Sequence, residues 1–391
     1  MTQIQENKLP EWWIETTLGE VWKVITWKTP SKDNPEDWWD WVDFITPTDF
    51  KTESKYLSVT SRKLSDLWKN RFSKMIIPKK SIIVTCIWSD MWKVVINSND
   101  SLTNQQINSI IVNENYNVDF IYYKLKDSYN ILKALADWGS TMPILNKSTF
   151  EKISLLLPPL PEQQAIAKIL SSFDDKIELL REQNETLEKI GQEIFKEWFW
   201  RYKVWDELPE GWRVGKLGKI LKFIKWKKPN DTSEVFIDWY ILQILIETFD
   251  SWKVTYANPK NTVLINEYDL IMVMDWASSW RLEIWYNWIV WSTLSKIEVD
   301  ENLKLMIYAF LKSKFKEIND WTTGSSIPHT DKAKIFNFDY FITDENYIND
   351  FNKLYWSFLN KILDNKKQIQ TLSKTRDELL PKLMKGEVRV V

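Results

Sequence analysis

Cysteine and histidine are nearly absent from this chain, whose 391 residues include one of each. The single thiol, Cys86, excludes a disulfide framework and any thiolate zinc site, and is typical of a reducing cytosol. The single imidazole, His329, excludes a multi-histidine metal site. No apolar run approaches the ~18–20 residues needed to span a membrane, and the N-terminus shows no signal-peptide pattern. These absences predict a soluble, cytoplasmic protein with neither a metal site nor a membrane partner.

Common catalytic motifs are also missing. The sequence contains neither a GxxxxGK[ST] phosphate loop nor a GxSxG nucleophile elbow. We expect Cys86, which follows an apolar run, to be a buried small hydrophobe, and His329 to be a surface-loop residue rather than a general base. Carboxylates are plentiful, but no spacing selects a pair. We therefore expect no active site and no cofactor on this chain.

Two stretches of sequence occur twice, in the same order. LPEWWIETTLGEVWKVITWKTPS at 9–31 matches LPEGWRVGKLGKILKFIKWKKPN at 208–230, a shift of 199 residues. GSTMPILNK at 139–147 matches GSSIPHTDK at 324–332, a shift of 185 residues. The chain is therefore predicted to consist of two homologous halves, with globular modules at 1–157 and 205–345.

A long helical pattern ends each half, at 158–204 and 346–391. Its seam residues follow alternating steps of four and three, which form a heptad seam. Each seam contains one asparagine, which can specify register at a cost in stability. The prediction is a mutual coiled coil; a helix packed only on its own module is the alternative. The seams, 185 residues apart, are Ile166, Leu170, Phe173, Ile177, Leu180, Asn184 and Leu187, then Phe351, Tyr355, Phe358, Ile362, Asn365, Ile369 and Leu372, continuing to Gly191 and Arg376.

The modules have the pattern of a mixed fold with short elements. The apolar runs 76–87 and 262–274 predict β-strands, and 97–112 predicts a turn followed by a strand. The segments 16–25 and 215–225 are expected to be short amphipathic helices, since apolar residues from Leu217 to Ile224 share one helical face. The predicted fold class is α+β: two globular domains separated by two long helices, with a pseudo-two-fold internal repeat.

The net charge of −2 does not by itself indicate a nucleic-acid partner. One local stretch does, because residues 211–230 contain one arginine and six lysines with no acidic residue. Such a stretch can neutralise phosphates, although a solvated helix face would have the same composition. A second basic run lies between Arg62 and Lys80.

The paired LPE[G/W]W starts, the half-repeat and the segment LPPLPEQQAIAKILSSFDDKIELLREQNETLEKIGQEIFKEWF resemble the specificity subunit of type I restriction–modification enzymes. The resemblance covers nearly the whole chain, and FITPTDF at 44–50 adds to it. It implies two target-recognition domains that each read half of a bipartite site in double-stranded DNA. It also implies that 158–204 and 346–391 are conserved spacer helices, paired as an antiparallel coiled coil.

The same resemblance implies the partners. Two modification (adenine methyltransferase) subunits would bind the repeats, and ATP-dependent restriction subunits would join them. S-adenosylmethionine, ATP and Mg²⁺ would belong to those partners, so this chain would be non-catalytic. Two other classes of function stay open: a Trp-rich carbohydrate- or peptide-binding protein, and a coiled-coil scaffold.

Candidate DNA-binding residues come from polar loops that recur in both halves, because side chains in such loops can position phosphates and read base edges. Ordinary turn residues are the alternative at each position. The candidates are Lys28, Thr29, Ser31, Ser140, Thr141, Asn146 and Lys147 in the first module, and Lys227, Lys228, Ser325, Ser326, His329 and Lys332 in the second.

Glycine is scarce, with 8 residues where about 27 would be average, whereas 25 residues are tryptophan. We hypothesise that many of these tryptophans are glycines encoded by UGA, which some bacterial lineages read as Gly. A genuinely Trp-rich protein is the alternative. Such positions often need a positive φ or a close backbone approach. They are Trp12, Trp27, Trp88, Trp92, Trp138, Trp226, Trp276, Trp280, Trp288, Trp291 and Trp321, whereas Trp13, Trp198 and Trp212 fit the family pattern as tryptophan.

Overall fold

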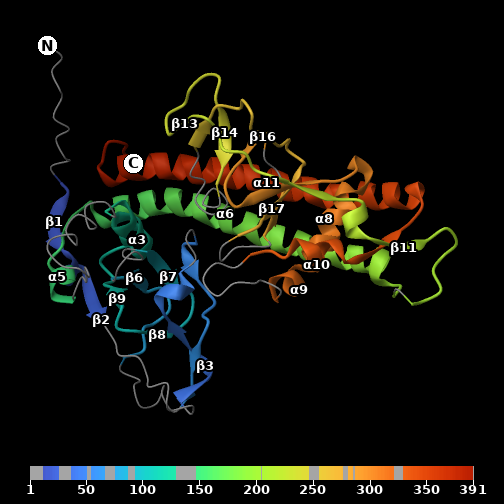
Figure 1. The fold of residues 1–391 in the computed structure, drawn as a ribbon. Coiled ribbons are helices and arrows are strands. Elements are labelled where there is room, and N and C mark those ends of the chain that lie inside the picture. The colour runs from blue at the N-terminus through green and yellow to red at the C-terminus, as the bar shows by residue number, and fades with distance from the viewer. Residues whose placement is uncertain are drawn as a thin grey trace. The chain divides into compact units, whose positions relative to one another are not determined.

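A computed structural model describes residues 12–25, 37–50, 54–66, 75–86, 93–128, 147–203, 205–245, 255–275, 281–284, 287–320 and 329–390. The chain forms two compact units. The first consists of Met1–Leu179 with Thr371–Val391, and the second of Leu180–Gln370. Each unit therefore contains sheets, short helices and one segment of each long helix (Figure 1).

The main sheet of the first unit has the strand order β2–β9–β6–β7–β4. Neighbours are antiparallel except β4 and β7, which pair in parallel. The apolar face of the sheet is covered by α3 (Val118–Asp127), whose Phe120, Tyr122 and Tyr123 are buried with Ile82 and Ile110. The strands are β2 (Trp22–Ile25), β4 (Tyr56–Leu57), β6 (Ile82–Thr85), β7 (Val94–Asn97) and β9 (Ile107–Val112).

Smaller elements complete the first unit. Strands β5 (Lys63–Leu64), β3 (Trp38–Ile45) and β8 (Ser101–Thr103) form a second sheet in that order. A two-stranded ribbon joins β1 (Ile14–Thr17) to β10 (Ser154–Leu157). The short helical elements are α1 (Leu18–Val21), η2 (Pro47–Asp49) and α5 (Lys147–Glu151).

The second unit has a main sheet with the order β12–β20–β17–β18, all antiparallel. The first unit has the same arrangement in β2–β9–β6–β7: β12 takes the place of β2, β20 that of β9, β17 that of β6 and β18 that of β7. The strands are β12 (Lys222–Lys225), β17 (Leu270–Val273), β18 (Leu282–Glu283) and β20 (Leu294–Glu298).

The terminal ribbon of the second unit also has a counterpart in the first. A ribbon pairs β11 (Arg213–Lys216) with β21 (Asp339–Ile342), as β1 pairs with β10. A further sheet has the order β13 (Thr232–Ser233), β15 (Thr255–Ala257), β14 (Ile241–Ile244), β19 (Ile289–Val290) and β16 (Val263–Leu264). The helices are η6 (Leu217–Lys219), η7 (Glu301–Leu303), α8 (Lys304–Ser313), α9 (Phe315–Asp320) and α10 (Lys332–Phe336).

The two segments expected to be amphipathic helices have a different structure. Each is a strand, a single helical turn and a second strand: β1–α1–β2 at 14–25 and β11–η6–β12 at 213–225. The helix prediction is wrong because partners distant in sequence, β9 and β10 or β20 and β21, take up the backbone hydrogen bonds. The strands expected within 76–87, 97–112 and 262–274 are confirmed.

The repeated Leu-Gly pair lies at the same structural position in both units. Leu18 and Leu217 are fully buried, and their backbone N–H groups donate to the carbonyls of Ile153 and Phe338, respectively. The following glycine faces a short helix, so that a Cβ on Gly218 would lie 2.8 Å from Phe336 Cβ. Close approach of two backbones therefore explains why Leu-Gly occurs in both halves.

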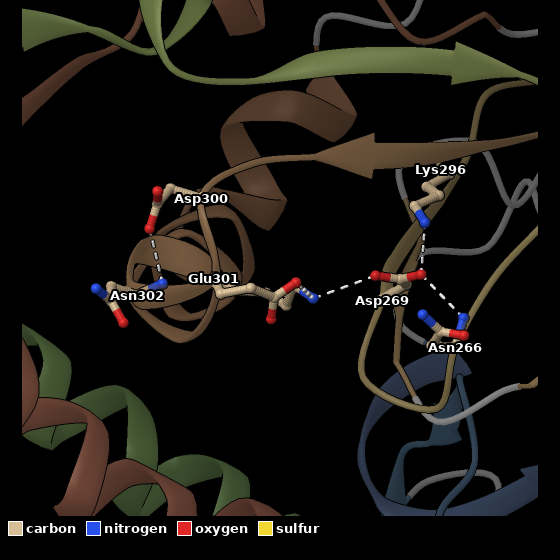
Figure 2. Close-up of polar contacts among 7 residues, drawn as sticks. Asn266, Asp269, Lys296, Asp300, Glu301 and Asn302 are labelled. Carbon is tan, nitrogen blue, oxygen red and sulfur yellow. Dashed lines mark hydrogen bonds and ion pairs between the residues drawn. The ribbon is translucent and has the colours of Figure 1, made fainter.

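A buried carboxylate joins three elements of the second unit. Asp269, in the turn before β17, accepts from Lys296 Nζ of β20 at 2.6 Å and from Lys304 Nζ of α8 at 3.1 Å (Figure 2). The backbone N–H of Asn266 also donates to it at 2.9 Å. Burial raises the pKa of Asp269, but these donors lower it below its ordinary value, so the carboxylate stays charged.

The long helices are α6 (Leu160–Phe195), continued by the π-helical turn η5 (Lys196–Trp200), and α11 (Glu345–Met384). Both lie where the heptad pattern predicts them. Every predicted seam residue from Ile166 to Leu187 and from Phe351 to Leu372 is buried or half-buried. The stripe is therefore the packed face of each helix.

Within each unit the two helices contact each other at seam positions or directly beside them. In the second unit Asn365 Nδ2 donates to Asn184 Oδ1 at 2.9 Å, and Gly191 lies against the ring of Tyr355. Residue numbers thus rise along α6 as they fall along α11, so these segments are antiparallel. In the first unit Arg376 contacts Asp174 at 2.5 Å.

Four of the tryptophans at expected glycine positions are described: Trp12, Trp226, Trp288 and Trp291. None of these four residues has a positive φ, so the first of the two expected reasons for a glycine does not apply to them. Gly211, the repeat counterpart of Trp12, does have φ +81°, whereas Trp12 Nε1 donates to Glu162 at 3.2 Å. Trp27, Trp88, Trp92, Trp138, Trp276, Trp280 and Trp321 lie outside the described residues.

Candidate DNA-recognition face

Polar and basic residues of the second unit gather at one end of its main sheet. Lys225, the last residue of β12, pairs with Ser295 near the start of β20, and Val273, the last residue of β17, pairs with Leu294. The loops that leave β12 and β17 therefore begin at the same end of the sheet, on either side of β20. Lys225, Lys227 and Lys228 are exposed there.

His329 is held at this end of the sheet by backbone contacts. It forms an isolated antiparallel bridge with Asp275, and the N–H of Thr330 donates to the carbonyl of Met274 at 2.7 Å. His329 Nδ1 lies 2.6 Å from Asp275 Oδ1. The imidazole is 56% and the carboxylate 37% exposed, so a ligand can reach both side chains. This confirms the prediction of a surface histidine.

Lys332 completes the group. It is the first residue of α10, capped by the Asp331 carboxylate, and its ammonium lies 5.2 Å from the centre of the Phe223 ring. Burial lowers the pKa of Lys332, the charge of Lys225 lowers it further, and Asp275 opposes both. Lys332 therefore lies close to the charges of both Lys225 and Asp275. Four of the six candidates of the second module, Lys227, Lys228, His329 and Lys332, lie at or near this end of the sheet.

Most candidates of the first module cannot be placed. Lys28, Thr29, Ser31, Ser140, Thr141 and Asn146 lie outside the described residues, as do Ser325 and Ser326 of the second module. Lys147 is described: like its counterpart Lys332 it begins a short helix, and its ammonium lies 3.6 Å from Glu151. The strand ends that correspond to Lys225 and Val273 are Ile25 and Thr85.

Sequence reasoning missed one residue of this face, Asp275, and two exposed aromatic residues elsewhere in the second unit. Asp275 directly follows the apolar run 262–274, and an acidic residue at a strand end was the available signal. Phe236 and Trp239, in the loop between β13 and β14, are 63% and 61% exposed. No periodicity marks such loop aromatics, so only their position after the basic stretch could have drawn notice.

Cys86 is buried, as predicted, and burial raises the pKa of its thiol to about 12. It accepts from Asn108 Nδ2 at 3.0 Å and is not a thiolate nucleophile at neutral pH. Within the described ranges, no three His, Cys, Asp or Glu side chains form a group that could hold a metal ion. Of the helices described, none is long and apolar enough to cross a membrane.

Comparison with known proteins gives a consistent family. Residues 10–189 match the model of the type I restriction modification DNA specificity domain. The MjaIX specificity subunit of Methanocaldococcus jannaschii is 30% identical, over 98% of this chain and 95% of that protein. The HindI specificity subunit of Haemophilus influenzae is 39% identical over 38% of this chain and 33% of its own.

A solved structure has the same fold. The S subunit of a type I restriction–modification system from M. genitalium superposes with a TM-score of 0.57 at 19% identity, covering 98% of this chain and 99% of its own. The likeness of sequence extends over the whole length, including both units and both long helices. The chain therefore belongs to the family of type I restriction–modification specificity subunits, the proteins that determine which DNA sequence such a system recognises.

Proposed function

We propose that each unit reads one half of a bipartite duplex site, and that this chain is the non-catalytic, DNA-reading part of its complex. The observation that carries the proposal is the shared strand order of the two main sheets, β2–β9–β6–β7 and β12–β20–β17–β18. Together with the repeated sequence it supports an internal duplication. A duplicated reader suits a site that is contacted in two places.

We infer that α6 and α11 form an antiparallel coiled coil that spaces the two readers. With 36 and 40 residues, they would be about 54 and 60 Å long at 1.5 Å per residue. The buried seams and the Asn184–Asn365 contact support this inference. A rigid spacer of this kind would accept only one separation between the half-sites.

The chemistry of the candidate face fits DNA. Lys225, Lys227 and Lys228 supply exposed ammonium groups for phosphates. Asp275 offers an acceptor to the amino group of cytosine, and His329 offers a ring nitrogen to a base edge. Positioning would come from the lysines and sequence discrimination from the His329–Asp275 pair.

Partners supply the catalytic steps in this proposal. Two modification subunits and the restriction subunits bind the chain and bring S-adenosylmethionine, ATP and Mg²⁺. The missing phosphate-loop motif of this sequence supports that division of labour. A carbohydrate- or peptide-binding function is less well supported, because residues 10–189 match a DNA specificity domain.

The test begins with the target. Sequencing the methylated adenines of a host that expresses the complex would give the bipartite motif. Binding of the purified complex to that duplex should weaken steeply with salt, and should fail when the spacer is lengthened by one base pair. Equal binding to unrelated duplexes, or a complex without a modification subunit, would contradict the proposal. A scaffold protein would show no sequence preference.

A further inference from the structure

A connected set of buried charged and polar side chains fastens the first recognition module to its helix pair. In the first unit, Asp174 of α6 accepts from Arg376 of α11 and from the Tyr123 hydroxyl of α3, both at 2.5 Å. The side chains of Asp174 and Arg376 are only 5% and 6% exposed. Burial and the charge of Asp174 raise the pKa of Tyr123, so its hydroxyl keeps the proton it donates.

Lys55 extends the contact to another part of the module. Its ammonium, on a side chain that is 1% exposed, lies 2.7 Å from Asp119 of α3 and donates to Ser171 of α6 at 2.7 Å. It also lies 5.1 Å from the centre of the Tyr123 ring. We call Lys55, Asp119, Tyr123, Ser171, Asp174 and Arg376 the clamp.

The fold does not need the clamp in order to form. At a shift of 185 residues, the counterparts of Tyr123, Asp174 and Arg376 in the second unit are Tyr308, Leu359 and Gly191. A cavity of about 320 Å³, lined by these three residues among others, lies where the first unit has its charged pair. Tyr308 is buried, but an acid no longer faces it from the counterpart position.

The second unit is fastened by different charges. Glu283 of β18 pairs with Lys366 of α11 at 3.2 Å, and Glu267 pairs with Lys367 at 2.6 Å. The cost of removing two charges from water offsets most of the electrostatic attraction of a buried ion pair. The hydrogen bonds of such a pair are nevertheless directional, so they restrict how the two side chains can be oriented. We therefore expect the Asp174–Arg376 pair, which the second unit lacks, to contribute orientation more than net stability.

We propose that the clamp sets the orientation of the first recognition module on the helix pair, and thereby the spacing at which its half-site is accepted. Tyr123, Asp174 and Arg376 are positioning residues in this scheme, since none of them has to touch DNA. The inference rests on bipartite reading and adds which residues make that reading selective for spacing.

The main experiment compares affinities of the complex for three duplexes: the native spacer, and spacers one base pair longer and shorter. The paired variant Asp174→Leu/Arg376→Met replaces the charges by apolar groups, a change that is often neutral for stability. We expect the preference for the native spacer to fall by about tenfold or more, in the range that one mismatched base pair costs, while the variant keeps its melting temperature. A folded variant with an unchanged preference would overturn the proposal.

If the paired variant does not fold, variants that lack a single hydroxyl group test the clamp instead. Tyr123→Phe should lower the spacing preference, whereas Tyr308→Phe, the matched change in the second unit, should leave it unchanged. Equal effects of the two, or no effect of the first, would contradict the clamp. The exposed pair Lys353–Asp350 of α11, replaced as Lys353→Met/Asp350→Leu, controls for charge removal alone.

A distance measurement separates the clamp from the proposed function. Spin labels at Glu114→Cys and Lys374→Cys, both exposed positions of the first unit, report on the module relative to α11. Cys86 is buried and should stay unlabelled. The distance distribution should broaden in the paired variant, and an unchanged distribution would overturn the clamp. A wild-type complex that binds all three duplexes equally would instead contradict bipartite reading.

Discussion

Asn365 Nδ2 donates to Asn184 Oδ1 across α6 and α11, at 2.9 Å, within a seam whose other residues from Ile166 to Leu187 and from Phe351 to Leu372 are aliphatic or aromatic. Asn365 is fully buried, and within the described part of the chain its Oδ1 has no hydrogen-bond partner. Each seam contains one asparagine, and these two asparagines form a polar contact with each other. Such a contact specifies register and disfavours slipped pairings.

Replacing one member of this pair should destabilise the second unit. Asn184→Ala leaves the buried amide of Asn365 with only a long 3.4 Å hydrogen bond to Gln183 Oε1, a loss that should cost about 1–3 kcal/mol. Asn184→Leu/Asn365→Leu removes both polar groups and should recover that stability, while specifying register less strictly. Denaturant unfolding of the variants measures both effects. A double variant as unstable as the single one would contradict the pairing.

Glu283 should make the protein sensitive to acid. Burial raises the pKa of Glu283, but Lys366, Lys312 and Arg281 together lower it to about 2, against an ordinary value of 4.5. The folded-state pKa is depressed, so its contribution is present above pH 4.5 and is lost as the pH falls towards 2. The amount is on the order of 3 kcal/mol.

Glu283→Gln should therefore flatten stability against pH in that window. Unfolding followed by circular dichroism from neutral pH downward gives the comparison. The exposed residue Glu345, at the start of α11, supplies the control Glu345→Gln, which should keep the wild-type slope. An acid slope of Glu283→Gln equal to that of the wild type would contradict the ion-pair assignment.

Alanine in the repeated Leu-Gly pair should be tolerated unequally. A Cβ on Gly218 would meet Phe336 Cβ at 2.8 Å, whereas one on Gly19 would meet Glu151 at 3.3 Å. Gly218→Ala should lower the free energy of unfolding by about 1–3 kcal/mol through overpacking, and Gly19→Ala by less. Thermal unfolding distinguishes the two, and the reverse order would show that α10 yields more readily than α5.

The lysines after β12 should contribute affinity without sequence preference. Lys227→Ala/Lys228→Ala should weaken binding to all duplexes and reduce the salt slope of log K by about 0.9 for each phosphate that is no longer neutralised. Lys219→Ala, in the same basic stretch but before β12, is the matched control and should change neither quantity. A changed base preference in the double variant would mean that these lysines read bases.

The hypothesis that many of the tryptophans are UGA-encoded glycines predicts the masses of peptides from the native protein. Peptides from the native protein that contain residues 12, 226, 288 and 291 should have glycine there, and the gene should have UGA codons. Indole masses at these residues, or UGG codons, would contradict the hypothesis. Trp13 should remain tryptophan, because its side chain is 6% exposed and packs beside Lys124. The same holds for Trp212, whose ring lies 4.8 Å from that of Tyr347.

The long helices could be predicted because their signal is local and sustained. Seven seam positions repeat in each helix, and each is packed in the structure. Of the short elements, the apolar strands within 76–87, 97–112 and 262–274 could also be predicted. The segment at 14–25 could not, since β1 is a strand only because Leu157 pairs with Ile14, more than a hundred residues away. A helical period over Leu217–Ile224 was therefore misleading.

The recognition face was predictable only in part, for a similar reason. Repeated polar loops identified His329 and Lys332, but not the carboxylate of Asp275 that faces His329. The clamp was not foreseen at all, because Tyr123, Asp174 and Arg376 come from three helices and carry no motif. Which distant side chains meet is decided by the packing of those helices.

The β1–β10 and β11–β21 ribbons place the two ends of each globular module next to each other. Ile14 pairs with Leu157, and Arg213 pairs with Ile342, so the first and last strands of each module are adjacent. A module bounded in this way can be replaced by one of another length without moving the helix that follows it. We expect exchange of the segments between these ribbons to produce folded chimeras, so that new sequence specificities can arise by recombination rather than by gradual substitution.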